Sequence, residues 1–336
     1  MSNFDLSDDR RNPGPAGAGD MPARRAALRF VATAGALVVI LLGAYLFLSR
    51  SGGRYVVVYT SQDQVYAEPI LQEFTRQTGI EVRAVYDNEA VKTVGLANRL
   101  LAERSHPQGD VFWNNEELRT RQLAAQDVFR PENGWRALGY RSRRLAINTN
   151  CLALARAPRT WTDLTNSNWR GKVALAYPLF GTTATHFLAL RQLWGDAPWQ
   201  EWCRALNRNE PFLVDGNSVV VKLVGRGQAW IGLTDSDDIK AGQREGLPIV
   251  ELPLTAESWL VPNTVAVINR APHPEDAQQL FLYLQSPEVP NRLVQVQALE
   301  GVDAVQVPAR TLAIKWDDLL RDLEPATIIL KQIFLR

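Results

Sequence analysis

Short apolar runs alternate with longer amphipathic segments over residues 55–115, and this alternation constrains the fold more than any other feature of the chain. The apolar runs have the length and composition of buried strands, and they are YVVVYTS (55–61), IEVRAVYD (80–87) and DVFWNN (110–115). Residues 65–79 and 91–105 space their apolar side chains as helices do, and Gly79 ends the first of them. Strand, helix, strand, helix, strand is the order typical of a parallel α/β sheet.

The same pattern continues to the C-terminal part of the chain. Further strands are predicted at 143–150, 172–178 and 264–272, and helices at 181–195 and from Pro274 to about 288. Residues 212–233 read as a strand end, a helix and another strand. The length of 336 residues is enough for about two domains.

The N-terminal region predicts a membrane anchor. Residues 1–25 are polar and predict a disordered cytoplasmic tail, and residues 26–49 are almost wholly apolar and long enough to span a bilayer as one helix. Arginines at 24, 25 and 29 place the tail in the cytoplasm, so everything after Arg50 lies outside it. A cleavable signal peptide is the rival interpretation, but LFLSRSGG offers no small-residue cleavage site, which favours an uncleaved, single-pass inner-membrane anchor.

Charge and cysteine content exclude some classes of function. The net charge is only +1, so the composition gives no reason to expect a nucleic-acid partner. The two cysteines, Cys151 and Cys203, form no CxxC motif, and the chain has no HExxH motif, so a zinc site of that kind is not predicted. An exported domain allows a disulfide between them, but two separate buried thiols fit the sequence as well.

Nothing in the sequence predicts an enzyme. The chain has no nucleophile elbow and no phosphate-binding loop, and the glycines of GRGQAW (225–230) follow a predicted helix rather than a strand.

Five segments in order resemble the extracellular solute-binding proteins of ABC importers, in particular their ferric-iron-binding branch. These segments include VVVYTSQDQ (56–64), DVFWNNE (110–116), GKVALAYP (171–178), DGNSVVVKLVGRGQAWIGLTDSDD (215–238) and PNTVAVINR (262–270). The resemblance implies a two-lobed periplasmic-binding-protein-like α/β fold of type II with hinge strands, here preceded by one N-terminal transmembrane helix. Lobe one is then 54–148 plus 265–336 and lobe two 149–264, with crossings near 146–150 and 260–267.

In open α/β sheets, ligands bind outside the carboxyl ends of the strands. That rule and the resemblance select the same four loops. The candidate ligand-binding residues in them are Ser61, Gln62, Asp63, Trp113, Asn115, Glu116, Gly181, Thr182, Thr183, Asp235 and Asp237.

The segment Gly181–Thr185 predicts an anion site. Gly181 allows a tight turn, and the first N–H groups of the following helix point outward beside the threonine hydroxyls. Phosphate, carbonate or a carboxylate fits such a cradle, although an ordinary threonine N-cap explains the same residues. His186 is either a donor to that anion or a packed histidine.

The acidic segment TDSDD (234–238) is where the sequence departs from its iron-binding relatives, which typically place two adjacent tyrosines after the strand matching AWIGL. The carboxylates of Asp63, Glu116, Asp235 and Asp237 still offer oxygen ligands to Ca²⁺, Mn²⁺ or Fe³⁺. A bound metal ion with phosphate or carbonate is one expectation. An organophosphate or aminophosphonate is the other, with its amine paired to Asp235 or Asp237. Asp238 is expected to cap a helix starting near Ile239.

The sequence therefore predicts a membrane-anchored periplasmic substrate-binding protein of an ABC transporter, which captures a small molecule or ion and delivers it to permease subunits. A tethered solute sensor is the alternative of another class, although a tail of about 25 residues is too short for a signalling domain.

Overall fold

The structure is a computed structural model that describes residues 53–86, 94–132, 134–303 and 311–335. The strands are β1 (Tyr55–Thr60), β2 (Glu81–Tyr86), β3 (Val111–Asn114), β4 (Trp135–Asn148), β5 (Val173–Ala176), β6 (Phe212–Val214), β7 (Ile231–Asp235), β8 (Ile249–Glu251) and β9 (Leu260–Val267). The helices of the N-terminal half are α2 (Gln64–Thr78), α3 (Val94–Glu103), α4 (Glu117–Ala124) and three short 3₁₀ turns at Leu154–Arg156, Thr162–Thr165 and Ser167–Trp169. Those that follow are α5 (Gly181–Trp194), α6 (Asp196–Arg208), α7 (Asn217–Gly225), α8 (Ser236–Arg244), α9 (Pro274–Gln285), α10 (Glu288–Gln295) and α11 (Trp316–Phe334).

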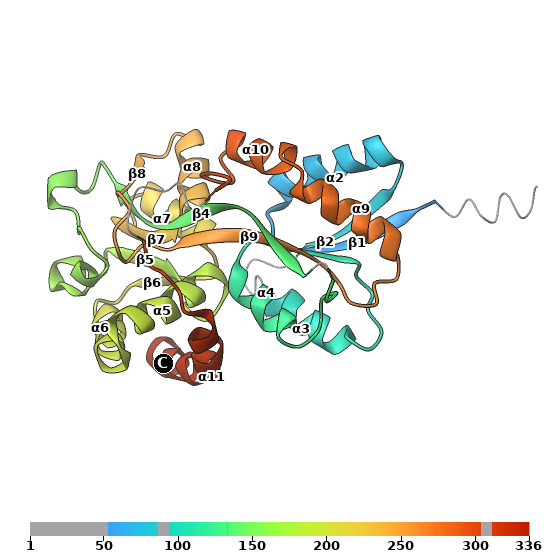
Figure 1. Ribbon diagram of the computed structural model, residues 1–336. Helices are drawn as coiled ribbons and strands as arrows, with labels where there is room; N and C mark the ends of the chain where they lie inside the picture. The colour runs from blue at the N-terminus through green and yellow to red at the C-terminus, as the bar shows by residue number, and fades with distance from the viewer. Residues whose placement is uncertain (1–52, 87–93, 133, 304–310, 336) are drawn as a thin grey trace, which may run out of the picture. The chain divides into compact units, whose positions relative to one another are not determined.

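Residues 54–335 form two α/β lobes, as the sequence predicts (Figure 1). In the first lobe, β1 pairs in parallel with β2 and β3, and β9 joins antiparallel to β3. In the second lobe, β5 pairs in parallel with β6 and β7. Each lobe has its own buried apolar clusters, so each sheet is stabilised by helices packed on it.

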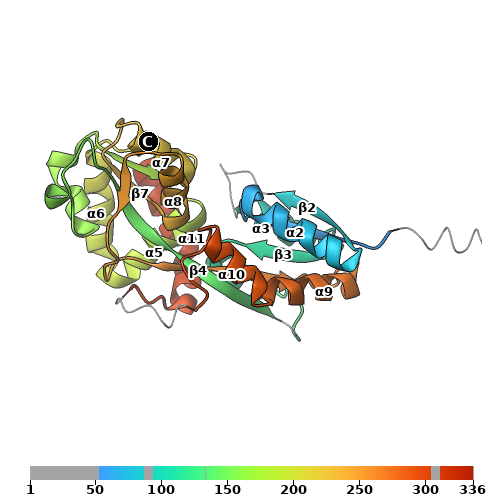
Figure 2. The ribbon, with the colours of Figure 1, turned by 90° about the horizontal axis from the view of Figure 1, so that it is seen from above.

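Strands β4 and β9 connect the two lobes. Through Ser142, strand β4 pairs with β9, and from Arg143 onward it pairs with β7 and β8 (Figure 2). The change of partner therefore falls between Ser142 and Arg143, a few residues before the crossing that the sequence predicts at 146–150. The prediction of 260–267 for the other crossing matches β9.

The C-terminal helix differs from its predicted place. The sequence assigns all of 265–336 to lobe one, but α11 packs against α5 and α6, and its Leu319, Leu330 and Phe334 are buried in the core of lobe two. The reason is its apolar face, which fills the space beside Phe187 of α5. Residues of α9 and α10 do lie with lobe one, since Leu280 and Leu293 belong to its core.

Helix α2 illustrates how the sequence sets an element's limits. Asp63 precedes it in an extended conformation, and Gly79 ends it with a φ of 71° and an N–H bond to the Thr75 carbonyl. Ile70, Leu71 and Phe74 are its buried face.

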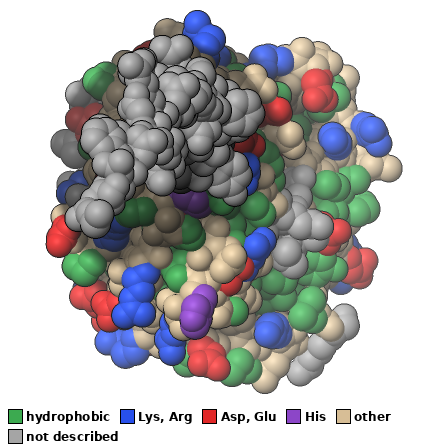
Figure 3. All heavy atoms as spheres, turned by 90° about the vertical axis from the view of Figure 1, so that its right-hand side faces the viewer, with side chains coloured by type: hydrophobic (Ala, Val, Ile, Leu, Met, Phe, Trp, Pro, Cys, Tyr) green, Lys and Arg blue, Asp and Glu red, His purple; other side chains and the backbone are tan. Residues whose placement is uncertain are grey.

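The predicted tail and anchor, 1–25 and 26–49, lie outside the described residues. In the part of the chain that the structure describes, none of the helices combines the length and hydrophobicity needed to cross a membrane. Cys151 and Cys203 are separate free thiols, and Cys203 is buried. On the end of lobe one seen in Figure 3, the described basic and acidic side chains are interspersed, in keeping with the net charge of +1.

Candidate functional site

A small polar cavity of about 50 Å³ lies where the two lobes meet. It is lined by Asp63, Asn115, Arg141, Ala176, Tyr177, Phe180, Gly181, Thr182, Thr183, Asp215, Gly216, Asn217, Asp235, Asp237 and Asp238. The first turns of α5, α7 and α8 all reach it, and Asp63 brings the start of α2 to it from lobe one. Several helix N-termini thus meet at one cavity, and each favours negative charge beside it.

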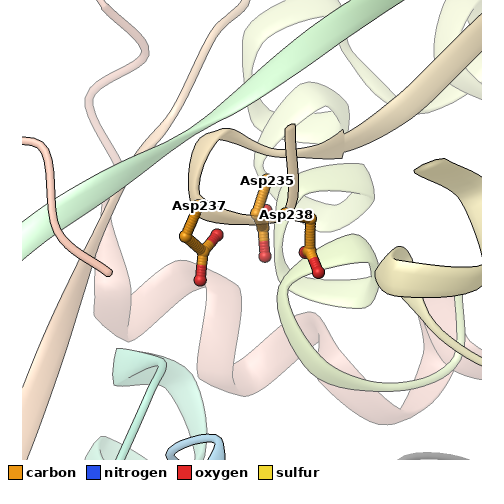
Figure 4. A group of neighbouring side chains, drawn as sticks. All are labelled: Asp235, Asp237 and Asp238. Carbon is orange, nitrogen blue, oxygen red and sulfur yellow. The ribbon is translucent and has the colours of Figure 1, made fainter. Parts of the chain in front are cut away.

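Three carboxylates point the same way where β7 meets α8 (Figure 4). Asp235 is the last residue of β7, and Asp237 and Asp238 lie in the first turn of α8. Oxygen atoms of Asp235, Asp237 and Asp238 lie within 4.8 Å of one another. Helix α8 begins at Ser236 with Asp235 as its N-cap residue, so the predicted role of Asp238 as a cap near Ile239 is wrong. Asp238 instead lies in the first turn of α8 and lines the cavity.

Asp235 is held by protein donors on both carboxylate oxygens. Its Oδ1 accepts from Arg143 Nη1 at 2.7 Å, and its Oδ2 accepts from Thr182 Oγ1 at 2.7 Å and Asn217 Nδ2 at 3.0 Å. Arg141 lies 3.4 Å from the same Oδ2. Burial alone raises the pKa of Asp235, but the charges of Arg143 and Arg141 outweigh it and hold that pKa below its ordinary value. Asp235 therefore serves as a buried anchor for the helix starts around it.

Glu116, another predicted metal ligand, is also occupied within the protein. It caps α4 by accepting from the N–H groups of Leu118 at 2.6 Å and Arg119 at 3.0 Å, and it accepts from Thr185 Oγ1 at 3.3 Å. It is 1% exposed and is not among the residues lining the cavity. Burial raises its pKa despite the charge of Arg119.

Three further candidates lie behind the cavity wall. Ser61 accepts from the Asn115 N–H at 2.9 Å, and Gln62 Oε1 accepts from Asn263 Nδ2 at 2.6 Å. Trp113 is fully buried in the core of lobe one. Ser61 and Gln62 support the wall, whereas Trp113 contributes to folding of the lobe.

The start of α5 forms the opposite wall. Gly181 has a φ of 53°, and the first N–H to bond within the helix is that of Ala184, which donates to Phe180 O at 3.1 Å. The hydroxyl of Thr182 donates to Asp235, so this hydroxyl is used within the protein, and the first N–H groups of the helix are the donors that remain for a ligand. His186 is a packed histidine: it is fully buried, contacts the Glu257 carbonyl through Nε2 at 2.6 Å and packs edge-on against Trp161.

The structure adds residues that sequence reasoning missed. They are Arg141, Ala176, Tyr177, Phe180, Asp215, Gly216, Asn217 and Asp238. Arg141 and Arg143 carry a usable signal, because two arginines at alternate positions of a strand share one face, and a buried arginine needs an acidic partner. The sequence TDSDD supplies that partner.

Hydrogen bonds outside the cavity also connect the lobes. Thr185 of α5 donates to Glu116, and Arg244 of α8 donates to the Tyr66 hydroxyl of α2 at 2.8 Å. These hydrogen bonds show that the two lobes contact each other in this structure.

Comparison with known proteins gives a consistent assignment. Residues 55–295 match the family model described as bacterial extracellular solute-binding protein. The major ferric iron-binding protein of Neisseria meningitidis is 24% identical over 284 residues, which are 77% of this chain and 84% of that protein. The Fe(3+)-binding periplasmic protein of Serratia marcescens is 28% identical over 231 residues, 63% of this chain and 65% of that one. These relatives are solute-binding proteins rather than enzymes.

Solved structures share the fold. Iron-bound HitA from Pseudomonas aeruginosa superposes with a TM-score of 0.72 at 19% identity, covering 84% of this chain and 99% of that chain. AfuA from Actinobacillus pleuropneumoniae, with exogenous fructose-6-phosphate bound, gives 0.69 at 19% identity, covering 84% and 98%. At such identities the likeness establishes the two-lobed fold.

Proposed function

The chain belongs to the bacterial extracellular solute-binding protein family, and we propose that it captures a hard metal ion together with a small oxyanion between its lobes. The observation that carries this proposal is the composition of the cavity wall. Carboxylates of Asp63, Asp237 and Asp238 share one cavity with the N-terminal backbone of α5 and α7. Hard cations prefer carboxylate oxygens, and helix N-termini bind oxyanions.

The size of the cavity favours a small ligand. A volume of about 50 Å³ exceeds the roughly 10–15 Å³ that one water needs, but it is far below the roughly 300–1,000 Å³ of pockets for drug-sized molecules. A metal ion with phosphate or carbonate fits that scale better than a sugar phosphate does.

The ligand set differs from paired phenolates. Asp237 and Asp238 lie in the first turn of α8, in the segment where the resemblance to iron-binding relatives implies two tyrosines. Carboxylates bind Mn²⁺ and Ca²⁺ as well as Fe³⁺, so we expect less discrimination among these ions than phenolate ligands provide. Asp235 and Glu116 do not take part as ligands in this proposal, because protein donors use their oxygens.

A second candidate is an aminophosphonate or another organophosphate. The acidic turn at Asp237 and the helix starts at Gly181 and Asn217 face one cavity, so an amine and a phosphonate have complementary partners in it. AfuA, which shares the fold, is a structure with a sugar phosphate bound.

We further propose that residues 26–49 anchor the protein in the inner membrane, with the binding lobes on the periplasmic side. The closed lobes would then present the captured ligand to ABC permease subunits. A tethered sensor of the same solute is the alternative, and finding permease and ATPase genes beside this gene would favour transport over sensing.

A thermal-shift screen of residues 54–336, which form one compact unit, tests the proposal. The ligands are Fe³⁺, Mn²⁺ and Ca²⁺, each with and without phosphate or carbonate, and separately aminoethylphosphonate and fructose-6-phosphate. A ligand that binds only the folded state stabilises that state by mass action, by about 2.7 kcal/mol when its concentration is a hundred times Kd. This stabilisation raises the Tm. We expect a metal-dependent rise that increases when the oxyanion is added.

The substitution Asp237→Asn removes a pocket charge without changing side-chain shape and should abolish the rise. Asp317→Asn is the matched control, since it removes the same charge at the exposed start of α11, outside the cavity. A rise with aminoethylphosphonate and none with any metal refutes metal capture in favour of the second candidate.

A further inference from the structure

Arg141 lies on β4 next to the point where this strand passes from one lobe to the other. Ser142 is opposite Leu260 of β9, whereas Arg143 is opposite Asp235 of β7. Arg141 and Arg143 therefore share one face of the strand but lie on either side of the crossing. Both side chains are buried, at 3% and 0% exposure.

The guanidinium of Arg141 contacts both lobes. On the side of lobe one, its Nη1 donates to the Asn115 carbonyl at 2.7 Å and to Asn263 Oδ1 at 3.0 Å. On the side of lobe two, its Nε lies 3.4 Å from Asp237 Oδ1, and its Nη2 lies 3.4 Å from Asp235 Oδ2. The shorter bonds are those to lobe one.

Arg143 makes a different set of contacts, although it pairs with the same Asp235. It donates to Asp235 Oδ1 at 2.7 Å, Asn217 Oδ1 at 3.2 Å and the Leu233 carbonyl at 3.3 Å. All three partners belong to lobe two. The two arginines thus carry the same charge to the same carboxylate, but the contacts of Arg141 cross between the lobes.

We propose that Arg141 is a positioning residue for lobe closure: lobe one carries its charge, and closure pairs that charge with Asp235 and Asp237 of lobe two. When the lobes separate, the two short bonds keep the guanidinium with lobe one, and the 3.4 Å contacts to the carboxylates lengthen. Asp237 lines the ligand cavity, so Arg141 and a bound cation would interact with the same carboxylate.

Arg141 differs in its surroundings from Arg244, the other arginine named above that bonds between the lobes, whereas the neutral hydroxyl bond from Thr185 to Glu116 is buried. The Arg244–Tyr66 hydrogen bond is exposed, so water and salt weaken it. Arg141 and its carboxylates are buried, where charges interact more strongly. The carboxylates of Asp237 and Asp235 also hold the pKa of Arg141 above its ordinary value although burial lowers it, so the guanidinium stays charged.

The proposal rests on the proposed function only in assuming that the lobes open and close, and small-angle X-ray scattering of ligand-free residues 54–336 tests it. We expect Arg141→Met to have a larger radius of gyration than the unsubstituted protein. Arg143→Met, the matched control, should leave the radius unchanged, since its contacts lie within lobe two. Asp237→Asn should shift the radius in the same direction as Arg141→Met, and the double variant should open no further than Arg141→Met alone.

Arg141→Lys and Arg143→Lys form a second pair that retains the charge and so protects the test against misfolding. Arg141→Lys should give an intermediate radius, because one ammonium does not replace the fork that bonds Asn115 and Asn263 while facing Asp237. Equal radii for the unsubstituted protein and both Arg141 variants would overturn the proposal, as would equal expansion in the Arg143 variants. Failure of metal capture appears in the thermal-shift screen and leaves this ligand-free comparison unaffected.

Discussion

Replacing Asp235 by asparagine keeps the size of the side chain but removes the charge that compensates two buried arginines. In the native protein, Asp235 is 2% exposed, with Arg143 at 2.7 Å and Arg141 at 3.4 Å. Removing one partner of a buried ion pair costs about 3–5 kcal/mol, whereas exposed pairs contribute about 1 kcal/mol or less. Out of a total stability of roughly 5–15 kcal/mol, the loss is a large fraction.

Urea denaturation followed by tryptophan fluorescence measures this loss. A cost of about 3 kcal/mol corresponds to a fall in Tm of roughly 5 °C for a folded unit of about 280 residues, at about 2.1 cal/mol/K of unfolding entropy per residue. The double variant Asp235→Asn/Arg143→Met should recover part of the stability lost in Asp235→Asn, because it also removes the buried charge of Arg143 that Asp235→Asn leaves without its carboxylate. A cost below about 1 kcal/mol would refute the reasoning, since it would mean that the network behaves as a solvated surface pair.

The same network predicts a dependence on acid. The folded pKa of Asp235 lies below its ordinary value of 3.8, so its contribution is present above that pH and is lost as the pH falls through the folded pKa. The stability difference between the native protein and Asp235→Asn should therefore narrow below about pH 4.

Two further predictions concern stability away from the cavity. Burial, with the charge of Arg143 beside it, lowers the pKa of His186 to about 3, so the stability that His186 contributes is complete above about pH 6.5 and falls as the pH drops toward 3. His186→Gln keeps a donor for the Glu257 carbonyl and should remove a slope of up to about 1.4 kcal/mol per pH unit from urea titrations between pH 6 and 4.5; equal slopes would contradict this. Gly139 has a φ of 72°, and an added Cβ would lie 2.5 Å from Leu299 Cδ1, so Gly139→Ala should lose more stability than Gly79→Ala. At Gly79, with a φ of 71° and no atom within 4 Å of the added Cβ, only the backbone cost of about 1–2 kcal/mol applies; equal losses would exclude the clash.

The predicted order of strands and helices over residues 55–115 is confirmed because each element there is decided by local pattern. Helix α2 is an example: its apolar spacing and Gly79 fix its face and its end without reference to the rest of the chain. The place of α11 needed information that no local pattern holds. Its apolar face is visible in the sequence, but the lobe that this face packs against is decided by tertiary contacts, here with α5 and α6.

The candidate site shows the same division. The rule that ligands bind at the carboxyl ends of strands selected the loops, and Asp63, Asn115, Gly181 and Asp237 do line the cavity. The rule does not say which neighbouring side chain turns inward. Glu116 follows Asn115 directly, yet its carboxylate caps α4 instead of facing the cavity.

The position of α11 has a consequence for how the protein is made. Among the described residues, lobe one takes those of 54–86, 94–132, 134–142 and 260–303, and lobe two takes those of 143–259 and 311–335. Neither lobe is continuous along the chain, so as synthesis proceeds from the N-terminus, the first lobe waits for segments made after the second has begun. The second lobe in turn lacks Leu330 and Phe334 of its core until α11 has been made. Neither lobe is therefore expected to complete its folding before synthesis of the other has begun, so the two lobes do not fold one after the other.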